Sequence, residues 1–351
     1  MGIKIIDPST DPAWDAFVSS HRDGSIYHSS RWNEVLRQTY GYMPRYFILE
    51  DPFHTVRAGV PLMVVGTRIG HRKLVGLPFT PYCNPLAKNH DDLIRLLKSV
   101  LEYKKKIKAS SLEIRTKGPN HDYTDLSITR DQYFMTHILR LDSDLQKIKS
   151  FFHKSCIQRP LRKAEKNELI LHVSTDRRDL KDFYKLQLRT RKRHGVPPQP
   201  YRYFLNMWDE LHSPGFMDLL LATYKGAAIA AIIILKFKDT AIYQNGASDE
   251  RFLGLHPNHF LLWKAIKHVH GDGYSYFDFG RSSLDDDGLV QFKDRWGTKR
   301  CELVYYFHPK ASGATSTRQN NWRYKFSINF FRLLPISLSR IIGEFGYRYL
   351  G

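Results

Sequence analysis

Apolar and polar positions along this chain predict helices and strands that follow one another in two similar series. In the first half, leucines and a valine recur at i, i+3, i+4 and i+7 within Asp91–Tyr103, which is the spacing of one helix face. A shorter helix is predicted over Ser30–Thr39. Strands are predicted over Tyr46–Glu50, Val56–Val65, Lys73–Pro78, Leu112–Arg115 and Phe134–Leu141.

The second half repeats this order of elements. Lys225-Gly226 and Lys238-Asp239 separate consecutive apolar runs by a spacing typical of tight hairpin turns. The two halves share little residue-level identity, so the repeat is one of plan and not of sequence. Helices are predicted over Asp179–His194, Tyr203–Leu211 and Asn258–His270, and strands over Met217–Tyr224, Ala227–Phe237, Thr240–Gly246, Tyr274–Phe279 and Glu302–Phe307.

Hairpin-linked strands followed by a crossover helix and a further strand predict an α+β fold, with a mostly antiparallel mixed sheet flanked by helices. Because the series occurs twice, we expect tandem domains over residues 1–143 and 144–310. The boundary is placed near Asp142–Asp144, where a strand ends and a basic helix over Leu145–Asn167 begins. Residues 311–351 are predicted to form a linker, rich in Ser, Gly and Thr, and a basic amphipathic tail.

The charge of the chain narrows the class of partner. Its 351 residues include 54 Lys and Arg against 35 Asp and Glu, which gives a formal charge of +19. Such an excess favours RNA, anionic lipid or a phosphate-bearing substrate, although a generally basic soluble surface is the alternative. The three cysteines lack metal-ligand spacing, and the run Asp285–Asp287 lacks the Gly and Glu of a calcium loop. No metal site is therefore expected.

The sequence also bears on localisation. It begins without a basic-then-apolar signal pattern, and no uncharged apolar run approaches the roughly 20 residues that cross a bilayer. We therefore expect a cytoplasmic protein. The tail Trp322–Leu350 alternates basic residues with Phe, Leu and Ile and is interrupted at Pro335. It is predicted to lie on an anionic membrane, peripheral on the inner face, or alternatively to pack on the second domain.

Three blocks of residues carry candidate chemistry. A basic helix end spans Arg159–Lys166, Phe277–Ser282 reads FDFGRS, and Gly288–Gly297 reads GLVQFKDRWG. In this order the blocks resemble the Fem-type aminoacyltransferases of the GNAT (N-acyltransferase) superfamily, in the FemAB-like branch found in envelope and exopolysaccharide contexts. The resemblance extends roughly from Ser25 to Phe307. It implies that both predicted domains have the GNAT-like fold.

The resemblance implies an acyltransferase that moves an aminoacyl group from aminoacyl-tRNA to an amine of an envelope precursor, nucleotide- or lipid-linked. The family's oxyanion-stabilising lysine matches Lys293, and a fixed cation in a water-poor cleft lowers such a barrier by about 3 kcal/mol. A solvated lysine beside Asp294 is the alternative. Asp278 is the second catalytic candidate, because a carboxylate can accept the nucleophile's proton or hold its ammonium. A structural pair with Arg281 is equally consistent with the sequence.

Other residues are assigned to substrate binding. Four cations at i, i+3, i+4 and i+7 give one helix face that would follow the phosphates of tRNA or of a nucleotide- or lipid-linked sugar, or that is simply a solvated face. These are Arg159, Arg162, Lys163 and Lys166. The resemblance further implies substrate contacts from Phe292, Arg281, Tyr276, Trp296, Tyr82 and Trp32, of which Trp32 and the loop containing Tyr82 are the weaker matches.

The acyl donor is left open between two classes. No tightly bound cofactor is expected, and the co-substrate is aminoacyl-tRNA or acyl-CoA. GNAT enzymes that use acetyl-CoA hold its pyrophosphate on a glycine-rich turn, whereas Leu255–His259 contains no glycine and only Gly254 lies nearby. This favours aminoacyl-tRNA. The alternatives are an acyl-CoA-dependent N-acetyltransferase acting on an amino sugar or lipid, and a non-catalytic RNA- or membrane-binding protein.

Overall fold

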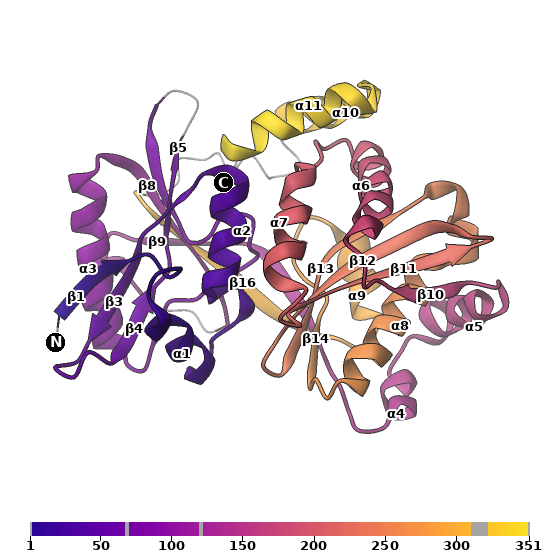
Figure 1. The fold of residues 1–351 in the computed structure, drawn as a ribbon, viewed down its shortest axis with the longest axis horizontal. Coiled ribbons are helices and arrows are strands. Elements are labelled where there is room, and N and C mark those ends of the chain that lie inside the picture. Colours follow the sequence, from indigo (N-terminus) through magenta and orange to yellow (C-terminus); the bar gives the residue numbers. More distant parts are fainter. Residues whose placement is uncertain (1, 67–69, 119–121, 310–321, 350–351) are drawn as a thin grey trace. The chain divides into compact units, whose positions relative to one another are not determined.

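A computed structural model describes residues 2–66, 70–118, 122–309 and 322–349 (Figure 1). The predicted linker over Ala311–Asn321 lies outside the described residues. The chain forms two compact units. The first comprises residues 1–134, 302–315 and 346–351, and the second comprises residues 135–301 and 316–345. The chain therefore enters the second unit within a strand, before the predicted boundary at Asp142–Asp144, and residues 302–315 return to the first unit.

The first unit contains two sheets. One has the strand order β1-β3-β4-β7 and is antiparallel, and the other has the order β16-β8-β6-β5-β2, in which β6 and β8 are parallel. The strands are β1 (Gly2–Ile6), β2 (Met43–Pro44), β3 (Tyr46–Glu50), β4 (Val56–Val60), β5 (Met63–Gly66), β6 (Arg72–Val75), β7 (Leu86–Ala87), β8 (Ala109–Lys117) and β16 (Lys299–His308). The helices are α1 (Pro12–Ser20), α2 (Ser30–Tyr40) and α3 (His90–Lys106).

Helix α3 covers the core of the first unit with the predicted apolar face. Leu96, Leu97 and Val100 are fully buried, and Asn89 caps the helix by accepting a hydrogen bond from the Asp92 amide at 2.8 Å. The single strand predicted over Val56–Val65 is wrong. Pro61 separates β4 from β5, which belong to different sheets, because proline has no N–H to continue a ladder.

The second unit is built on a sheet of strand order β10-β11-β12-β13-β14-β9, which is antiparallel except between β13 and β14. The strands are β9 (Thr129–Arg140), β10 (Ile170–Val173), β11 (Met217–Tyr224), β12 (Ala227–Phe237), β13 (Thr240–Ser248), β14 (Tyr276–Asp278) and β15 (Ser282–Ser283). The helices are α4 (Leu145–Ser150), α5 (Arg159–Lys166), α6 (Leu180–His194), α7 (Tyr201–Leu211), α8 (Pro257–Gly271), α9 (Asp287–Asp294), α10 (Trp322–Leu333) and α11 (Ile336–Gly346).

The apolar runs of β11 and β12 are buried on both faces of this sheet, and their bounds agree with the prediction. The long basic helix predicted over Leu145–Asn167 is divided instead. A π-helical turn, η3 (Lys154–Gln158), lies between α4 and α5, and Pro160 occupies the first turn of α5, where a missing N–H is tolerated. Short 3₁₀ turns occur at Ile26–His28, Thr124–Leu126, Arg177–Asp179, Glu250–Leu255 and Tyr347–Tyr349.

The parallel pair β13 and β14 determines where the second unit opens. Strand β14 pairs with the first three residues of β13, Thr240–Ile242, and then ends at Asp278. Strand β13 continues to Ser248, and helix α8 begins soon after it. The two strands consequently part beyond Ile242, and the space between them is available to a ligand.

Candidate functional site

A cavity of about 430 Å³ lies in the second unit where β13 and β14 part. Its wall comes from α6, from β12, from the part of β13 beyond its pairing with β14, from the start of α8 and from α9. The apolar lining includes Ile232, Leu253, Leu262, Phe279, Leu289 and Phe292. The polar lining includes Thr190, Arg193, His194, Tyr243, Ser248, His256, Asn258, His259 and Lys293. None of these residues is acidic, so the cavity suits an acyl chain attached to an anionic group.

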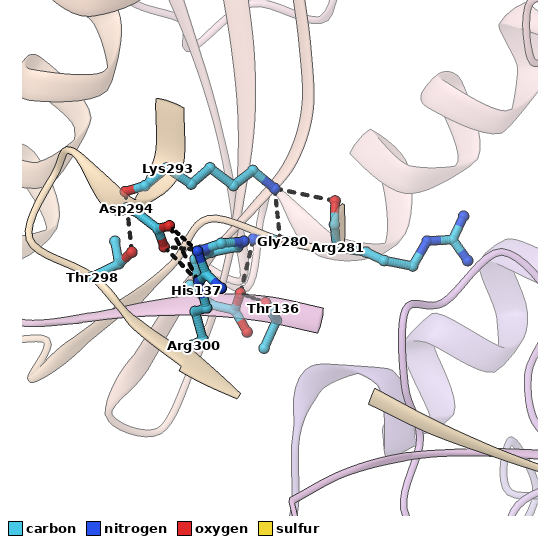
Figure 2. A network of polar contacts seen from close by, with 9 residues as sticks. Thr136, His137, Gly280, Arg281, Lys293, Asp294, Thr298 and Arg300 are labelled. Carbon is cyan, nitrogen blue, oxygen red and sulfur yellow. Dashed lines mark hydrogen bonds and ion pairs between the residues drawn. The ribbon is translucent and has the colours of Figure 1, made fainter. Parts of the chain in front are cut away.

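Lys293 is the buried cation of this cavity. Its side chain lies along the inner side of α9 and is only 6% exposed. Its Nζ donates hydrogen bonds to the carbonyl oxygens of Gly280 at 2.8 Å and Arg281 at 3.1 Å (Figure 2). Burial lowers the pKa of Lys293 to about 8, against the opposing effect of the Asp278 carboxylate. The alternative of a solvated lysine does not describe this side chain.

The geometry at Nζ leaves one position for a ligand. Two of the three ammonium hydrogens are directed at the Gly280 and Arg281 carbonyls. The third hydrogen can be donated in a hydrogen bond to a substrate oxygen. Because Lys293 lines the cavity, a carbonyl bound there can receive that hydrogen.

Gly280 makes this arrangement possible. Its φ is +71°, a region that L side chains rarely adopt, and a Cβ there would lie 2.9 Å from the Tyr243 carbonyl oxygen. The amide of Gly280 donates to Asp278 Oδ1 at 2.8 Å. The turn after β14 is thus held in the one conformation that points two successive carbonyls at Lys293.

Asp278 is fully buried, and its carboxylate stabilises the turn after β14 by hydrogen bonding. Its Oδ1 accepts hydrogen bonds from the Gly280 amide and from the Thr136 hydroxyl on β9. It does not belong to the cavity lining among the described residues. We therefore interpret it as a positioning residue and as the compensating charge for Lys293, while its predicted catalytic role stays a prediction.

Asp294 and His137 form the other side of the same network (Figure 2). His137 Nδ1 lies 3.3 Å from Asp294 Oδ1, and Arg300 Nε donates to that oxygen at 3.1 Å. His137 is fully buried, and burial followed by the charge of Lys293 lowers its pKa to about 4. His137 is consequently neutral at pH 7. The Lys293 carbonyl accepts from the Thr298 hydroxyl at 3.0 Å, which fixes the end of α9.

The aspartate run that resembled a metal loop has a structural function. Asp286 caps α9, because its Oδ1 accepts the Leu289 amide at 3.0 Å, and Asp287 lies in the first turn, where a negative charge is favourable. The loop before α9 is short, and Lys293 lies on a capped helix.

His259 was not predicted as a site residue, although it lines the cavity on α8. Its pKa is lowered to about 4, first by burial and then by the charge of the nearby His256, while a hydrogen bond to the Cys156 carbonyl opposes the shift. Its ring centroid lies 5.5 Å from that of Phe292 and 6.1 Å from that of Trp296. The only signal in the sequence for His259 was its position at the start of the helix predicted after the strand Thr240–Gly246.

The residues predicted to contact substrate do not all lie at the cavity. Phe292 lines the cavity, and Trp296 is fully buried behind it. The Arg281 side chain is exposed, as is Tyr276 on β14. Trp32 and Tyr82 belong to the first unit, where both pack against the Tyr27 ring, at centroid distances of 5.2 and 5.5 Å. They do not line the cavity of the second unit among the described residues.

The predicted basic face lies on α5. Leu161 and Ala164 are buried under it, and its four cations are exposed. These are Arg159, Arg162, Lys163 and Lys166. The charge of Lys163 contributes to lowering the pKa of His256, after burial. Because His256 lines the cavity, Lys163 is the residue of this face whose charge reaches the cavity lining.

A second polar cluster lies at the other end of α8. Asp218, His268 and Asp272 bring ligand atoms close enough together to hold a metal ion. Lys236 already occupies this space, since its Nζ lies 2.7 Å from Asp218 Oδ2 and 3.5 Å from Asp272 Oδ2. The cluster is therefore interpreted as an ion network. No helix among the described residues has the length and apolar character needed to cross a membrane.

Comparisons with known proteins agree with this architecture. Residues 153–294 match the acetyltransferase (GNAT) domain family. The lipid II:glycine glycyltransferase of Staphylococcus saprophyticus is 22% identical over 395 aligned positions, covering 85% of this chain and 91% of that protein.

Solved structures show the same fold. The crystal structure of FemX matches with a TM-score of 0.71 and 20% identity, covering 87% of this chain and 97% of that one. A tandem GNAT protein from the clavulanic acid pathway matches with a TM-score of 0.57 and 12% identity, covering 87% and 97%. The predicted α+β fold of two tandem GNAT-like domains, the resemblance to Fem-type proteins and the acyltransferase class are confirmed.

Proposed function

We propose that this acyltransferase of Fem-type GNAT fold transfers an aminoacyl group to an amine of a lipid-linked cell-wall precursor. The observation that carries the proposal is the buried Lys293 ammonium, which has one hydrogen directed at neither carbonyl and lines a cavity of acyl size. The staphylococcal relative, whose name gives lipid II as its acceptor and glycine as the transferred group, supports the class of substrate.

The geometry supports the following chemistry. The acceptor amine attacks the ester carbonyl of the donor, so that a C–N bond forms and negative charge develops on the carbonyl oxygen. The third hydrogen of Lys293 stabilises that oxygen, at a benefit of about 3 kcal/mol in a site screened from water. The C–O bond to the donor then breaks, and the proton lost by the amine passes to the leaving oxygen.

We propose aminoacyl-tRNA as the donor because the cavity rim is basic. The four cations on α5 lie on one exposed face, and Lys163 on that face is close enough to His256 to affect its pKa. Arg193 and His194 line the cavity as well. A polyphosphate chain entering the cavity would pass these groups, and each phosphate contact strengthens binding at low salt.

Acyl-CoA is the second candidate donor. The match of residues 153–294 to the acetyltransferase family favours it, and so does the start of α8 at the cavity. Against it, Leu255–His259 contains no glycine, and His256 itself adopts the left-handed conformation, with φ of 58°. A side chain thus occupies the place where a glycine would let a pyrophosphate approach the backbone.

We propose that the enzyme works in the cytoplasm on the inner surface of the membrane. A lipid-linked acceptor is anchored there, and an enzyme that meets it must approach the bilayer. The large positive charge of the chain favours an anionic surface.

The test uses the purified protein with charged tRNAs, with acetyl-CoA, and with lipid-linked or nucleotide-linked precursor as acceptor. Mass spectrometry identifies the product. We expect a mass increase of one aminoacyl group with charged tRNA. Lys293→Met removes the ammonium at similar side-chain length and is expected to lower turnover about 10²-fold. Lys299→Met, an exposed lysine nearby in sequence, is the matched control and should retain activity. Product from acetyl-CoA alone would contradict the proposal.

A further inference from the structure

Helix α11 has two faces of opposite character. Ser339 and Gly343, at i and i+4, are buried against the protein. Leu338, Ile341 and Phe345, at i, i+3 and i+7, share the opposite face and are 48%, 49% and 69% exposed. In α10, the apolar Phe330 and Leu333 are exposed as well. We call these five exposed residues the tail face.

Helices α10 and α11 pack on the second unit beside α6 and α7 (Figure 1). A Cβ on Gly343 would lie 2.1 Å from the Pro198 carbonyl oxygen, so the helix backbone touches the loop after α6. Arg202 Nε lies 3.6 Å from Glu344 Oε1. The tail face is therefore not exposed by fraying of the helices. It is the outer surface of a packed element.

Charge selects the class of partner for this surface. Residues 322–350 contain five Lys and Arg but a single acidic residue, Glu344, which Arg202 already neutralises. Arg340 is exposed on α11, at the flank of the tail face. Apolar side chains bordered by arginine are the composition of helices that lie in the headgroup region of an anionic bilayer.

The tail face is also connected to the cavity. Arg332 Nε donates to the Arg193 carbonyl at 3.1 Å, and Arg193 lines the cavity. The charge of Arg332 contributes to the lowered pKa of His194, another lining residue. A surface docked through α10 and α11 would thus lie close to the rim of the site.

We propose that the tail face docks the enzyme on an anionic membrane, with Leu338, Ile341 and Phe345 inserted among the lipid headgroups. The inference rests on the proposed function, because docking places the cavity next to a lipid-linked acceptor. A second copy of this chain is the competing occupant. It would cover the same apolar residues without requiring anionic lipid.

Vesicle sedimentation tests the docking. The wild-type protein is expected to bind vesicles of phosphatidylcholine with phosphatidylglycerol and to bind pure phosphatidylcholine much less. The triple variant Leu338→Ser, Ile341→Ser, Phe345→Ser should lose binding at least about tenfold while keeping its melting temperature. Phe53→Ser with Ile170→Ser, two exposed apolar residues elsewhere, is the matched control and should bind as the wild type does. Arg340→Glu should weaken binding only to the anionic vesicles.

Three results would overturn the docking proposal: no binding of the wild type, equal binding of the triple variant, or a dimer in analytical ultracentrifugation that the triple variant abolishes. Activity separates this outcome from the proposed function. The triple variant should retain transfer to a nucleotide-linked, water-soluble acceptor and lose transfer to a lipid-linked acceptor held in vesicles. Failure of the wild type with both acceptors would contradict the proposed function, while the sedimentation result still decides the docking.

Discussion

Lys293 Nζ donates a hydrogen bond of 2.8 Å to the carbonyl oxygen of Gly280, a residue whose backbone conformation leaves no room for a side chain. The two residues come from different elements, α9 and the turn after β14. The Lys293 ammonium can be buried because the Gly280 carbonyl accepts its hydrogen bond. That carbonyl points at the lysine because glycine allows the backbone conformation of the turn.

The pH dependence of turnover should report the state of Lys293. Its pKa is lowered to about 8 by burial, so the ammonium is lost as pH rises through that value. If the ammonium stabilises the oxyanion, kcat should fall with a one-proton decline above about pH 8. Lys293→Arg, which stays charged, should be slower but lack this decline. A decline centred near the ordinary lysine value of about 10 would contradict the assignment.

Substitution of Gly280 should act through the position of Lys293. Gly280→Ala places a Cβ 2.9 Å from the Tyr243 carbonyl oxygen at a φ of +71°, so the turn must shift. We expect a loss of about 1–2 kcal/mol in stability and a fall in kcat with little change in the donor's KM. Gly254→Ala, where nothing would meet the added Cβ, is the control. Equal kcat in the two variants would contradict a positioning role for the turn.

The basic face of α5 should be visible in salt titrations. Each cation that contacts a phosphate of a single strand contributes about 0.7 to the slope of log affinity against log salt. Lys163→Ala should therefore weaken tRNA binding and reduce that slope by about 0.7. Lys181→Ala, an exposed lysine on α6, should change neither quantity. If the salt dependence of tRNA binding is unchanged in the Lys163 variant, the basic face of α5 is a solvated face that does not contact phosphate.

The ion network at the end of α8 should make stability depend on pH. The pKa of Asp218 is lowered by hydrogen bonds to His268 and Lys236, although burial opposes this, so its contribution is present above pH 3.8 and lost as pH falls. The pKa of His268 is raised by Asp218, so its contribution is complete below pH 6.5 and lost as pH rises through the folded value.

Urea unfolding across pH tests this network. Stability from the cluster should be largest between about pH 4 and 6.5. Asp218→Asn should cost about 2 kcal/mol near pH 6, because the buried Lys236 loses its 2.7 Å carboxylate partner and retains Asp272 at 3.5 Å. His268→Gln should remove the decline above pH 6.5 and leave the acid limb. A pH-independent difference between the wild type and Asp218→Asn would contradict the ionic interpretation.

Regular elements could be predicted where a local pattern determines them. The bounds of β11 and β12 follow from uninterrupted apolar runs separated by a two-residue turn, Lys225-Gly226. Helix α9 could not be predicted in this way. It has one acidic cap, Asp286, and begins with Asp287-Gly288, residues of low helix propensity, so that its stability comes from the packing of Val290 and Lys293.

The candidate site could be predicted in part. Lys293 and Phe292 were found through the resemblance, and both line the cavity. His259 was missed because its importance depends on a contact with the Cys156 carbonyl, about a hundred residues away in sequence, and no local pattern encodes such a contact. Asp278 was also found, but its full burial was not predicted, and Tyr276, two residues earlier on β14, is exposed.

The early end of β14 has a consequence for how such an enzyme can diversify. The gap beside β13 begins where its backbone pairing with β14 stops, at Asp278. Residues such as Ile232 and Leu289 can therefore change in size to admit larger or smaller acyl groups while the strand ladder stays intact. New specificities are then accessible by single substitutions, without the cost of redesigning the scaffold.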